Sequence, residues 1–526
     1  MHQEPSVPVL AIDANPDAAW LQANLESLLA ALPAASLARQ RWFASKSDSI
    51  SSLSLVDGAV LGEGPAAVLA LVDVRLAAGP AATYSLPLAV RPEEDARRLG
   101  LPASGFLLVL AAPNGRHLLY DAAGDPDCAR ALLALVAGEA VLSGRRGRFS
   151  FAASGGQSLA LHLPVRPLGA EQSNTSLVYG DRYVLKLYRR LQNGPNPDVE
   201  LPLFLTTRAH FPYSPPLLGY AEYRRADFSA TFLSLQGFVA NEGNGWRYAL
   251  EQLANLSAAA RAAPAVPDES FVRQAAAASL QELRRLGETT ARLHLALSSR
   301  ADDPAFAPEP VAPGDVASWQ GALGRRLERT LAAARAAAGR LPAPTADRLC
   351  QLVGRGAALR RVSDGLSWPA VAGLFKIRHH GDYHLGQVLR TPGGFVVVDF
   401  EGEPARPLTE RRARHLALRD VAGLLRSLDY AAGAVTRAAA PDEGERTRRV
   451  AALWADLAGR EFLAGYRQTL AFSPLPLLPA GPALEEGVLA ALLLDKALYE
   501  LTYELDNRPD WVDLPLGYLS QLAALA

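Results

Sequence analysis

The sequence predicts an α+β fold in which a strand-rich segment is followed by a helical one. Short runs of β-branched and aromatic residues, bounded by turn residues, predict strands between residues 106 and 240. From residue 241 onward, long alanine-, leucine- and arginine-rich stretches separated by proline-rich linkers predict helices. Residues 1–105 contain an early helix and short alternating segments. We therefore expect three domains: an N-terminal cap (1–105), a strand-rich lobe (106–240) and a large helical lobe (241–526).

The same patterns predict the individual elements. Helices are expected first at Pro16–Leu32 and at the alanine- and leucine-rich segment Ala129–Leu142. The expected strands are Phe106–Ala111, His117–Asp121, Leu159–Val165, Ser176–Tyr179, Tyr183–Tyr188 and Ala230–Leu235. The helices expected in the last domain cover residues 247–262, 270–299, 316–340 and 446–470.

The composition is that of a globular chain. Its 526 residues are too many for one core, and 49% of them are hydrophobic while 20% are charged. The net charge of −1 gives no sign of a surface for nucleic acid or anionic membrane, and no apolar run approaches the length of a membrane span. Cys128 and Cys350 match no metal or disulfide pattern, and the N-terminal residues lack the pattern of a signal peptide. We expect a cytoplasmic protein.

The segment from residue 379 to 404 carries the chemistry. Asp382 is followed five residues later by Gln387, and a turn and a run of valines then lead to Asp399. This spacing is typical of a kinase catalytic loop and the strand end behind it. We expect Asp382 to accept the proton of an attacking hydroxyl, and Gln387 and Asp399 to hold Mg²⁺ through their oxygen atoms. Glu401 is placed to assist the metal or the acceptor. The alternative is a surface loop with scattered acids.

Three histidines accompany this segment. His379, His380 and His384 raise the alternative of a zinc site, but no cysteine or HExxH motif accompanies them. We expect them to pack the loop, with His384 lining the cleft.

The nucleotide side is predicted around Lys186. Lysine occurs only at positions 46, 186, 376 and 496 in a chain whose positive charge is otherwise arginine. Since a guanidinium replaces a compact ammonium poorly, Lys186 on its predicted strand is expected to orient the phosphates of ATP. The alternative is a solvated edge lysine. Glu200, in a helix that opens at Asn196-Pro197, is expected to pair with Lys186, although Pro202 interrupts that helix.

Two further segments complete the expected nucleotide site. A polar turn ahead of Lys186 can offer N–H and hydroxyl groups to phosphate, although a turn of this kind is often only a turn. The residues expected to bind there are Ser173, Asn174, Thr175 and Ser176. A strand end further along predicts the backbone that reads adenine, with an ordinary strand end as the alternative. The residues expected there are Gln236, Phe238 and Val239.

At these residues the chain resembles the bacterial maltokinases, relatives of the aminoglycoside phosphotransferase-like kinases. The matching segments are Arg41–Lys46, Glu171–Ser176, Val184–Arg190, His380–Gln387, Asp399–Pro404, Leu418–Gly423, Lys496–Glu500 and Asn507–Trp511. The resemblance implies a bilobal protein-kinase-like fold with an N-terminal cap domain. It also implies phosphorylation of maltose by ATP and Mg²⁺ at the anomeric hydroxyl, giving maltose 1-phosphate for glycogen synthesis from trehalose, and an association with trehalose synthase.

The acceptor sugar is expected at the helix 494–504. Lys496, Tyr499, Glu500 and Tyr503 share one face of that helix, and Trp511 follows as an aromatic wall. Arg419, which lies in one of the matching segments, is also expected to bind the acceptor sugar. The alternative is an amphipathic helix whose polar groups reach the solvent.

Two other functions stay open from the sequence. One is a kinase of the same fold that acts on glucosamine or another amino sugar. The other is a nucleotide-binding pseudokinase that regulates a partner such as trehalose synthase. The intact set of Asp382, Gln387, Asp399 and Lys186 argues against the pseudokinase.

Overall fold

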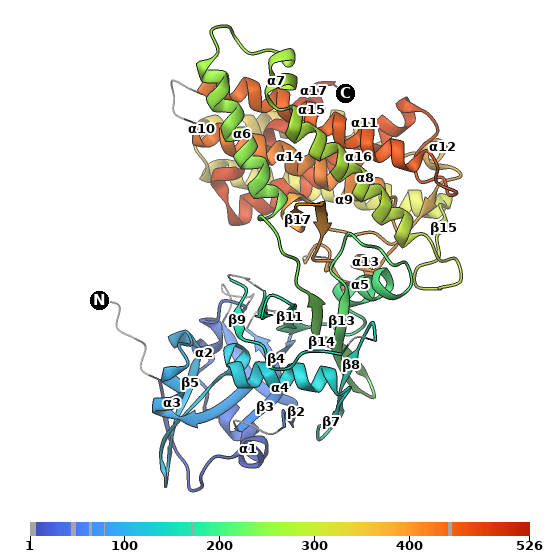
Figure 1. The fold of residues 1–526 in the computed structure, drawn as a ribbon. Helices are drawn as coiled ribbons and strands as arrows, with labels where there is room; N and C mark the ends of the chain where they lie inside the picture. The colour runs from blue at the N-terminus through green and yellow to red at the C-terminus, as the bar shows by residue number, and fades with distance from the viewer. Residues whose placement is uncertain are drawn as a thin grey trace. The chain divides into compact units, whose positions relative to one another are not determined.

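The computed structural model describes residues 7–43, 49–62, 66–77, 79–156, 158–169, 173–404, 406–439 and 444–525. Residues Ala44–Lys46 and Glu171–Gln172 of the matching segments lie outside this range. The chain divides into two compact units (Figure 1). The first comprises Met1–Thr207 and Pro215–Ala240, and the second comprises Arg208–Ser214 and Asn241–Ala526.

The first sheet of unit 1 lies between two hydrophobic cores. Its strands are β1 (Val9–Ala11), β2 (Ile50–Val60), β3 (Ala66–Leu76), β4 (Ala82–Pro92), β5 (Phe106–Ala112), β6 (Gly115–Asp121) and the short β12 (Arg190–Leu191). They are ordered β1-β5-β6-β4-β3-β2, and β12 pairs with β4. Along β3, Val68 and Val72 belong to the core that includes α1 (Ala18–Ala31), and Leu69 and Leu71 belong to the other core. Since β5 and β6 are part of this sheet, it extends beyond residue 105.

The second sheet of unit 1 is antiparallel throughout. Its strands are β7 (Val141–Ser143), β8 (Arg148–Ala153), β9 (Val165–Pro167), β10 (Asn174–Tyr179), β11 (Tyr183–Tyr188), β13 (Leu217–Arg225) and β14 (Phe228–Gly237), in the order β7-β8-β13-β14-β11-β10-β9. Gly180 and Asp181 both adopt positive φ and close the β10–β11 hairpin. That turn places Ser176 directly opposite Lys186.

Besides α1, unit 1 contains the helices α2 (Ala34–Ala38), α3 (Glu93–Arg98) and α4 (Pro126–Ala137). Helix α5 (Pro197–Thr207) follows β12. Two predictions in this region were wrong. The helix expected at Ala129–Leu142 ends at Gly138, and Val141 instead begins β7. The strand expected at Leu159–Val165 forms no ladder before Val165, and its leucines pack against the core from irregular backbone instead.

The second unit is mainly helical (Figure 1). Its long helices are α6 (Gly245–Ala262), α8 (Ala277–Leu297), α9 (Pro313–Ala337), α14 (Leu418–Ala438), α15 (Gly444–Leu470) and α16 (Pro482–Asn507). The shorter ones are α7 (Glu269–Ala275), α10 (Ala343–Gly354), α11 (Gly356–Ser363), α12 (Trp368–Val371), α13 (Leu408–Arg411) and α17 (Asp513–Leu525). Two small ladders, β15 (Glu309–Pro310) with β16 (Phe375–Lys376) and β17 (Val388–Thr391) with β18 (Gly394–Val397), complete it. Three of the four helical stretches expected from the sequence correspond to α6, α9 and α15, and the stretch 270–299 is divided at Ala276 into α7 and α8.

Helices α8 and α15 cross at glycines. A Cβ on Gly287 would lie 2.0 Å from the carbonyl oxygen of Phe462, and one on Gly465 would lie 2.1 Å from that of Arg284. Only residues without a side chain allow so close a backbone approach. The crossing brings His294 of α8 against Tyr466 of α15, behind the predicted catalytic loop. Among the described helices, none has the length and apolar character needed to cross a bilayer.

Candidate active site

The catalytic loop is anchored by a buried carboxylate that the sequence analysis did not single out. Asp420, near the start of α14, accepts hydrogen bonds from the backbone N–H groups of His380 (2.8 Å) and Gly381 (3.0 Å). His294 Nε2 lies 3.1 Å from the same carboxylate, and His294 Nδ1 lies 2.8 Å from the Tyr466 hydroxyl. Although burial opposes its charge, the hydrogen bond from His294 and the nearby histidines keep the pKa of Asp420 well below its usual range. The loop is thus held through its backbone by a charged group.

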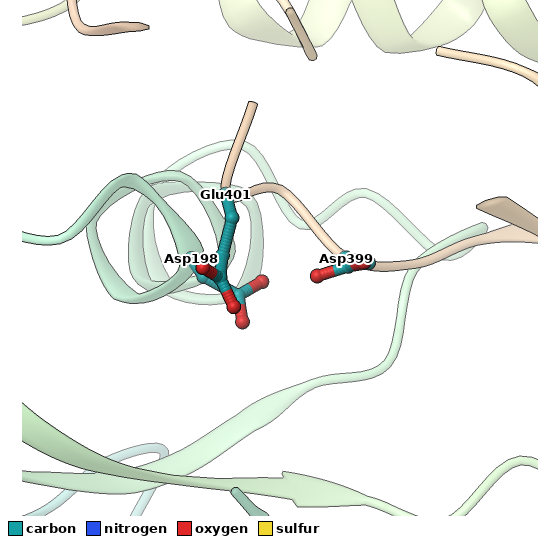
Figure 2. Close-up of side chains that lie close together, drawn as sticks. All are labelled: Asp198, Asp399 and Glu401. Atoms are coloured by element: carbon teal, nitrogen blue, oxygen red, sulfur yellow. The ribbon is translucent and has the colours of Figure 1, made fainter. Parts of the chain in front are cut away.

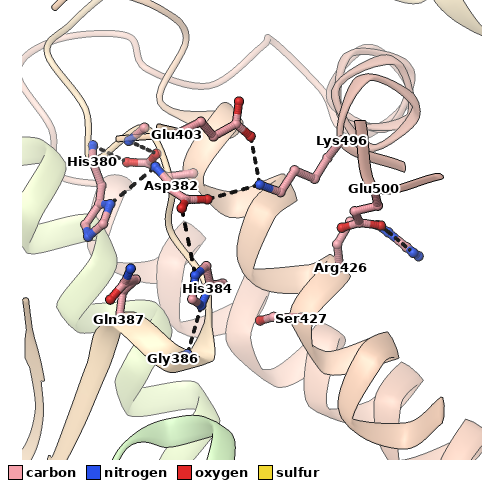
Figure 3. A network of polar contacts seen from close by, with 12 residues as sticks. His380, Asp382, His384, Gly386, Gln387, Glu403, Arg426, Ser427, Lys496 and Glu500 are labelled. Atoms are coloured by element: carbon pink, nitrogen blue, oxygen red, sulfur yellow. Dashed lines mark hydrogen bonds and ion pairs between the residues drawn. The ribbon is translucent and has the colours of Figure 1, made fainter. Parts of the chain in front are cut away.

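Asp382 lies beside a lysine from a distant helix (Figure 3). Lys496 of α16 donates to Asp382 Oδ1 at 3.2 Å and to Glu403 at 2.8 Å. His384 Nε2 is 3.9 Å from the other oxygen of Asp382. Although burial opposes their charge, Lys496 and Arg406 together hold the pKa of Glu403 well below its usual range, and Glu403 holds that of Lys496 above its usual range. Asp382 is therefore a carboxylate in an ionic network, with one of its oxygens bound to an ammonium.

The residues expected to hold Mg²⁺ lie together. Gln387, at the end of a short 3-10 turn (Leu385–Gln387), donates from Nε2 to Asp399 Oδ2 at 2.9 Å. Asp399 follows β18 with φ of +64°, a conformation that few residues other than glycine adopt and that is common at functional sites. Figure 2 shows Asp399 and Glu401 on this segment. The donor set of one amide and carboxylate oxygens suits a hard divalent cation, so these residues fit Mg²⁺.

The predicted acceptor residues divide into three groups. Arg419 and Lys496 line a small pocket together with Asp382 and Glu403. Tyr499 and Tyr503 stack on each other with 6.4 Å between ring centroids and line a separate cavity of about 620 Å³. The other two side chains make different contacts: Glu500 binds Arg426 at 2.8 Å, and Trp511 stacks on Tyr430.

Lys186 pairs with a carboxylate that the sequence analysis missed. Its ammonium is 3.0 Å from Asp198 Oδ2, and the Tyr188 hydroxyl donates to the same oxygen at 2.8 Å. Asp198 and Glu200 both lie in the first turn of α5, which Asn196 caps through the N–H of Asp198. The ion pair with Asp198 adds a partner for Lys186 that the sequence did not predict, and the pairing of Lys186 with Glu200 stays a prediction. The helix runs through Pro202 to Thr207, so the proline does not shorten it.

The segment ahead of Lys186 begins as a strand earlier than expected. Asn174, Thr175 and Ser176 belong to β10, and Ser173 precedes it as a bend. At the other predicted nucleotide segment, Gln236 pairs with Val184 near the end of β14, and the N–H of Phe238 donates to the carbonyl of Arg182. Val239 follows one residue before the end of unit 1 at Ala240. Their roles in nucleotide binding remain predictions.

A buried arginine ties the first sheet to the strand that carries Thr175. Arg189 forms an ion pair with Asp121 at 2.9 Å and donates to the Thr175 hydroxyl at 2.9 Å. Its guanidinium lies 4.7 Å from the ring of Trp42, whose Nε1 donates to Asp121. Both Trp42 and Arg189 belong to segments of the maltokinase resemblance, but the sequence analysis gave them no role. The only signal in the sequence was that each of these residues has a neighbour of the other kind, Arg41 before Trp42 and Tyr188 before Arg189.

Comparison with known proteins shows similarity to sugar kinases. A family model described as the maltokinase N-terminal cap domain matches residues 37–125. A glucosamine kinase of Streptacidiphilus jiangxiensis is 28% identical over 437 residues, which is 83% of this chain and 84% of that protein. A glucosamine kinase of Mycolicibacterium smegmatis is 27% identical over 361 residues, or 68% and 79% of the two chains.

Solved structures show the fold. The structure of a glucosamine kinase in complex with glucosamine, ADP and inorganic phosphate aligns with a TM-score of 0.64 and 25% identity, covering 95% of this chain and 99% of that one. Another crystal form of glucosamine kinase aligns with a TM-score of 0.66 and the same identity. The chain therefore has an α+β fold that it shares with the glucosamine kinase structures, together with a distant sequence similarity.

Proposed function

We propose that the protein is an ATP-dependent kinase that phosphorylates maltose at its anomeric hydroxyl to give maltose 1-phosphate. One arrangement carries the kinase assignment. Asp382 lines a small pocket, and Gln387 and Asp399, which follow it closely in the sequence, are hydrogen-bonded to each other. The two glucosamine kinases and the cap-domain match support a sugar as the acceptor. The route from trehalose to glycogen, and an association with trehalose synthase, follow from the resemblance to maltokinases alone.

The residues of this chain suit in-line phosphoryl transfer. Bound Mg²⁺, held by Gln387 and Asp399, would neutralise charge on the phosphates of ATP. The sugar oxygen forms a bond to the γ-phosphorus while the bond from that phosphorus to the departing ADP oxygen breaks. Asp382 takes the proton of the sugar hydroxyl at a carboxylate oxygen. The sugar hydroxyl can donate to Asp382 Oδ2, because Lys496 binds only Oδ1, and Glu403 holds the same ammonium in place.

The contacts of Lys496 favour a neutral acceptor. The pocket at Asp382 is lined by two cations, Lys496 and Arg419, and by four carboxylates, Asp382, Glu403, Asp420 and Asp495. Lys496 already binds Asp382 and Glu403, so the ammonium group of an amino sugar would compete with Lys496 for these carboxylates, whereas a hydroxyl group of a neutral sugar can accept a hydrogen bond from Lys496. One helical turn beyond Lys496, the stacked Tyr499 and Tyr503 line the larger cavity, which offers aromatic surface to a second sugar ring. A neutral disaccharide fits both features.

A glucosamine kinase is the second candidate. Both curated relatives carry that activity in their names and align over most of this chain. The Lys496 contact at Asp382 is the feature that argues against it.

The two candidates separate in one assay. ADP release from ATP would be measured with maltose, glucose, glucosamine, trehalose and an aminoglycoside, each over a range of concentrations. The proposal expects the highest kcat/KM with maltose and formation of an acid-labile anomeric phosphate ester. A preference for glucosamine would establish the second candidate. Absence of stimulation by every sugar would refute the kinase assignment and favour a pseudokinase.

A further inference from the structure

An arginine-rich cavity lies next to the catalytic pocket in unit 2. It has a volume of about 270 Å³ and is bounded by α9, the segment 406–419 and α16. Five arginines line it, against only two carboxylates, Glu410 and Asp495.

Not all of the arginines in the cavity have a direct partner among the described residues. Arg326 pairs with Asp495 at 2.8 Å, and Arg406 contacts Glu403, Glu410 and the same Asp495. Arg419 has no hydrogen-bond or ion-pair partner for its guanidinium among the residues that the structure describes, and it lines the cavity between these groups. Burial and the neighbouring Arg406 lower the pKa of Arg419, but a guanidinium stays charged at neutral pH. Asp495 and Glu403 attract Arg419 without a direct hydrogen bond to it, so its guanidinium keeps N–H donors that can bind an anion.

A buried polar atom without a partner lies in the wall of the cavity. His379 lines the cavity, is 5% exposed, and its Nδ1 atom is buried without a hydrogen-bond partner. Burial lowers the pKa of His379 to about 3, so the ring is neutral at pH 7 and can donate or accept one hydrogen bond. Buried polar atoms without partners are rare in proteins.

An aromatic wall stands beside the arginines. Trp319 lies over His415 with 4.3 Å between ring centroids and an interplanar angle of 30°, and His415 is 6.0 Å from the ring of His379. Trp319 and both histidines line the cavity. The cavity thus combines a cationic side for an anionic group with a flat apolar side, which suits the face of a sugar ring.

We propose that this cavity binds a phosphate dianion, carried either by inorganic phosphate or by a sugar phosphate monoester. Guanidinium groups bind phosphate oxygens in pairs through parallel N–H donors, which makes arginine the preferred side chain for this ligand. Arg419 and Arg406 bind the phosphate oxygens, and Trp319 packs on the sugar of a monoester. The site is distinct from the sugar hydroxyl that Asp382 deprotonates.

The cavity is connected to the catalytic base by shared residues. Arg419, Leu492 and Asp495 line both the cavity and the small pocket that holds Asp382. A chain of ion pairs runs from Arg406 through Glu403 and Lys496 to Asp382. A bound phosphate would draw Arg406 away from Glu403. Glu403 would then bind Lys496 more strongly, and Lys496 would bind Asp382 more weakly. This connection, which rests on the proposed kinase activity, predicts a rise in kcat with phosphate.

Binding is tested with the full chain and does not depend on activity. Isothermal calorimetry would titrate inorganic phosphate, a sugar 1-phosphate, acetate and maltose into protein saturated with Mg²⁺ and a non-hydrolysable ATP analogue, which fills the phosphate positions of the nucleotide site. The proposal expects one phosphate site that the analogue does not remove, and no site for acetate or maltose in the cavity. Tighter binding of the sugar phosphate, lost in Trp319→Ala, identifies the monoester as the ligand, while equal binding identifies free phosphate.

Two variants and one control locate the site. Arg419→Gln is expected to weaken phosphate binding at least tenfold. Ala322→Glu places a carboxylate on an exposed position of α9 that lines the cavity, and it is expected to abolish binding while leaving the fold intact. Arg467→Gln removes the same charge from α15 at a residue that pairs with Glu485 and does not line the cavity, so it should leave phosphate binding unchanged.

The outcomes decide the proposal in either direction. Phosphate binding that survives in Ala322→Glu, or that disappears when the nucleotide analogue is present, overturns it. If Arg419→Gln fails to fold, Ala322→Glu alone carries the test. A phosphate site without any change in kcat would overturn the connection to Asp382, and a chain that binds phosphate but phosphorylates no sugar would refute the proposed function without touching the cavity.

Discussion

At the scale of single residues, Asp382 is the group on which the proposed catalysis depends. Its carboxylate is placed in a pocket with Lys496 and close to the Gln387–Asp399 pair along the chain. An amide at this position keeps the shape of the side chain but cannot take a proton from a sugar hydroxyl.

Asp382→Asn is therefore expected to lower kcat by about a thousandfold, within the usual range for removal of a general base. Nucleotide binding, measured by calorimetry with an ATP analogue, should change little. Asp364→Asn, at an exposed aspartate of the same unit, serves as the control and should retain full activity. Turnover within tenfold of the parent chain would rule out Asp382 as the base.

Glu403 makes stability depend on pH. Its pKa is depressed in the folded chain, so its contribution to stability is fully present above the unfolded pKa of about 4.3 and is lost as pH falls toward the folded pKa. Glu403→Gln should cost about 3 kcal/mol at pH 7, because Lys496 and Arg406 lose a buried partner. Urea unfolding between pH 7 and pH 3 should show the two curves converging at acid pH. Glu410→Gln, at an exposed partner of the same Arg406, should run parallel to the parent chain.

At the scale of elements, α14 positions the catalytic loop through Asp420. Because this side chain accepts hydrogen bonds from two backbone N–H groups of the loop, we expect it to act as a positioning residue. Asp420→Asn removes the charge and leaves one of the three donors poorly satisfied.

We expect this variant to lose about 2–4 kcal/mol of stability and about a hundredfold in kcat, with little change in nucleotide affinity. A lower kcat with unchanged nucleotide affinity would indicate a misplaced loop, whereas general unfolding would reduce both. Asp429→Asn, on the same helix and paired with Arg426, is the matched control and should leave kcat within a few-fold. An equal loss of kcat in both variants would contradict a specific role for Asp420.

The strand β10 depends on Arg189 in a similar way. Arg189→Lys keeps the charge but cannot contact Asp121, Thr175 and the Trp42 ring at the same time. We expect a loss of about 2 kcal/mol in stability and a several-fold weaker affinity for an ATP analogue. Arg190→Lys, at the exposed neighbouring residue, should have neither effect. Unchanged nucleotide affinity in Arg189→Lys would show that the contact between Arg189 and Thr175 does not contribute to nucleotide binding.

At the scale of the whole molecule, two compact units with separate cores predict unfolding in more than one step. Differential scanning calorimetry should give a calorimetric enthalpy larger than the van't Hoff enthalpy. Arg189→Lys should lower the transition of unit 1, and Asp420→Asn that of unit 2. A single transition with equal enthalpies, shifted in the same way by both variants, would show that the units unfold together.

The sequence predicted those features of the site that depend on short separations. Gln387 and Asp399 flank one small hairpin, so their contact follows from local strand pairing and from the spacing of the motif. The hairpin that places Ser176 opposite Lys186 follows in the same way from a turn at Gly180. Errors of element boundary arose where a glycine ended a helix at residue 138 and where leucines packed without a ladder.

By itself, the sequence determined which groups are available for chemistry: two carboxylates and an amide at kinase spacing, and a lysine on a strand. Only the tertiary structure decided which groups meet over long separations. It paired Lys186 with Asp198, brought Lys496 to Asp382 and placed Asp420 under the loop. The physical reason is that residue type and periodicity specify local backbone and hydrogen-bonding capacity. The partner of a buried charge depends instead on how helices such as α14 and α16 pack around it.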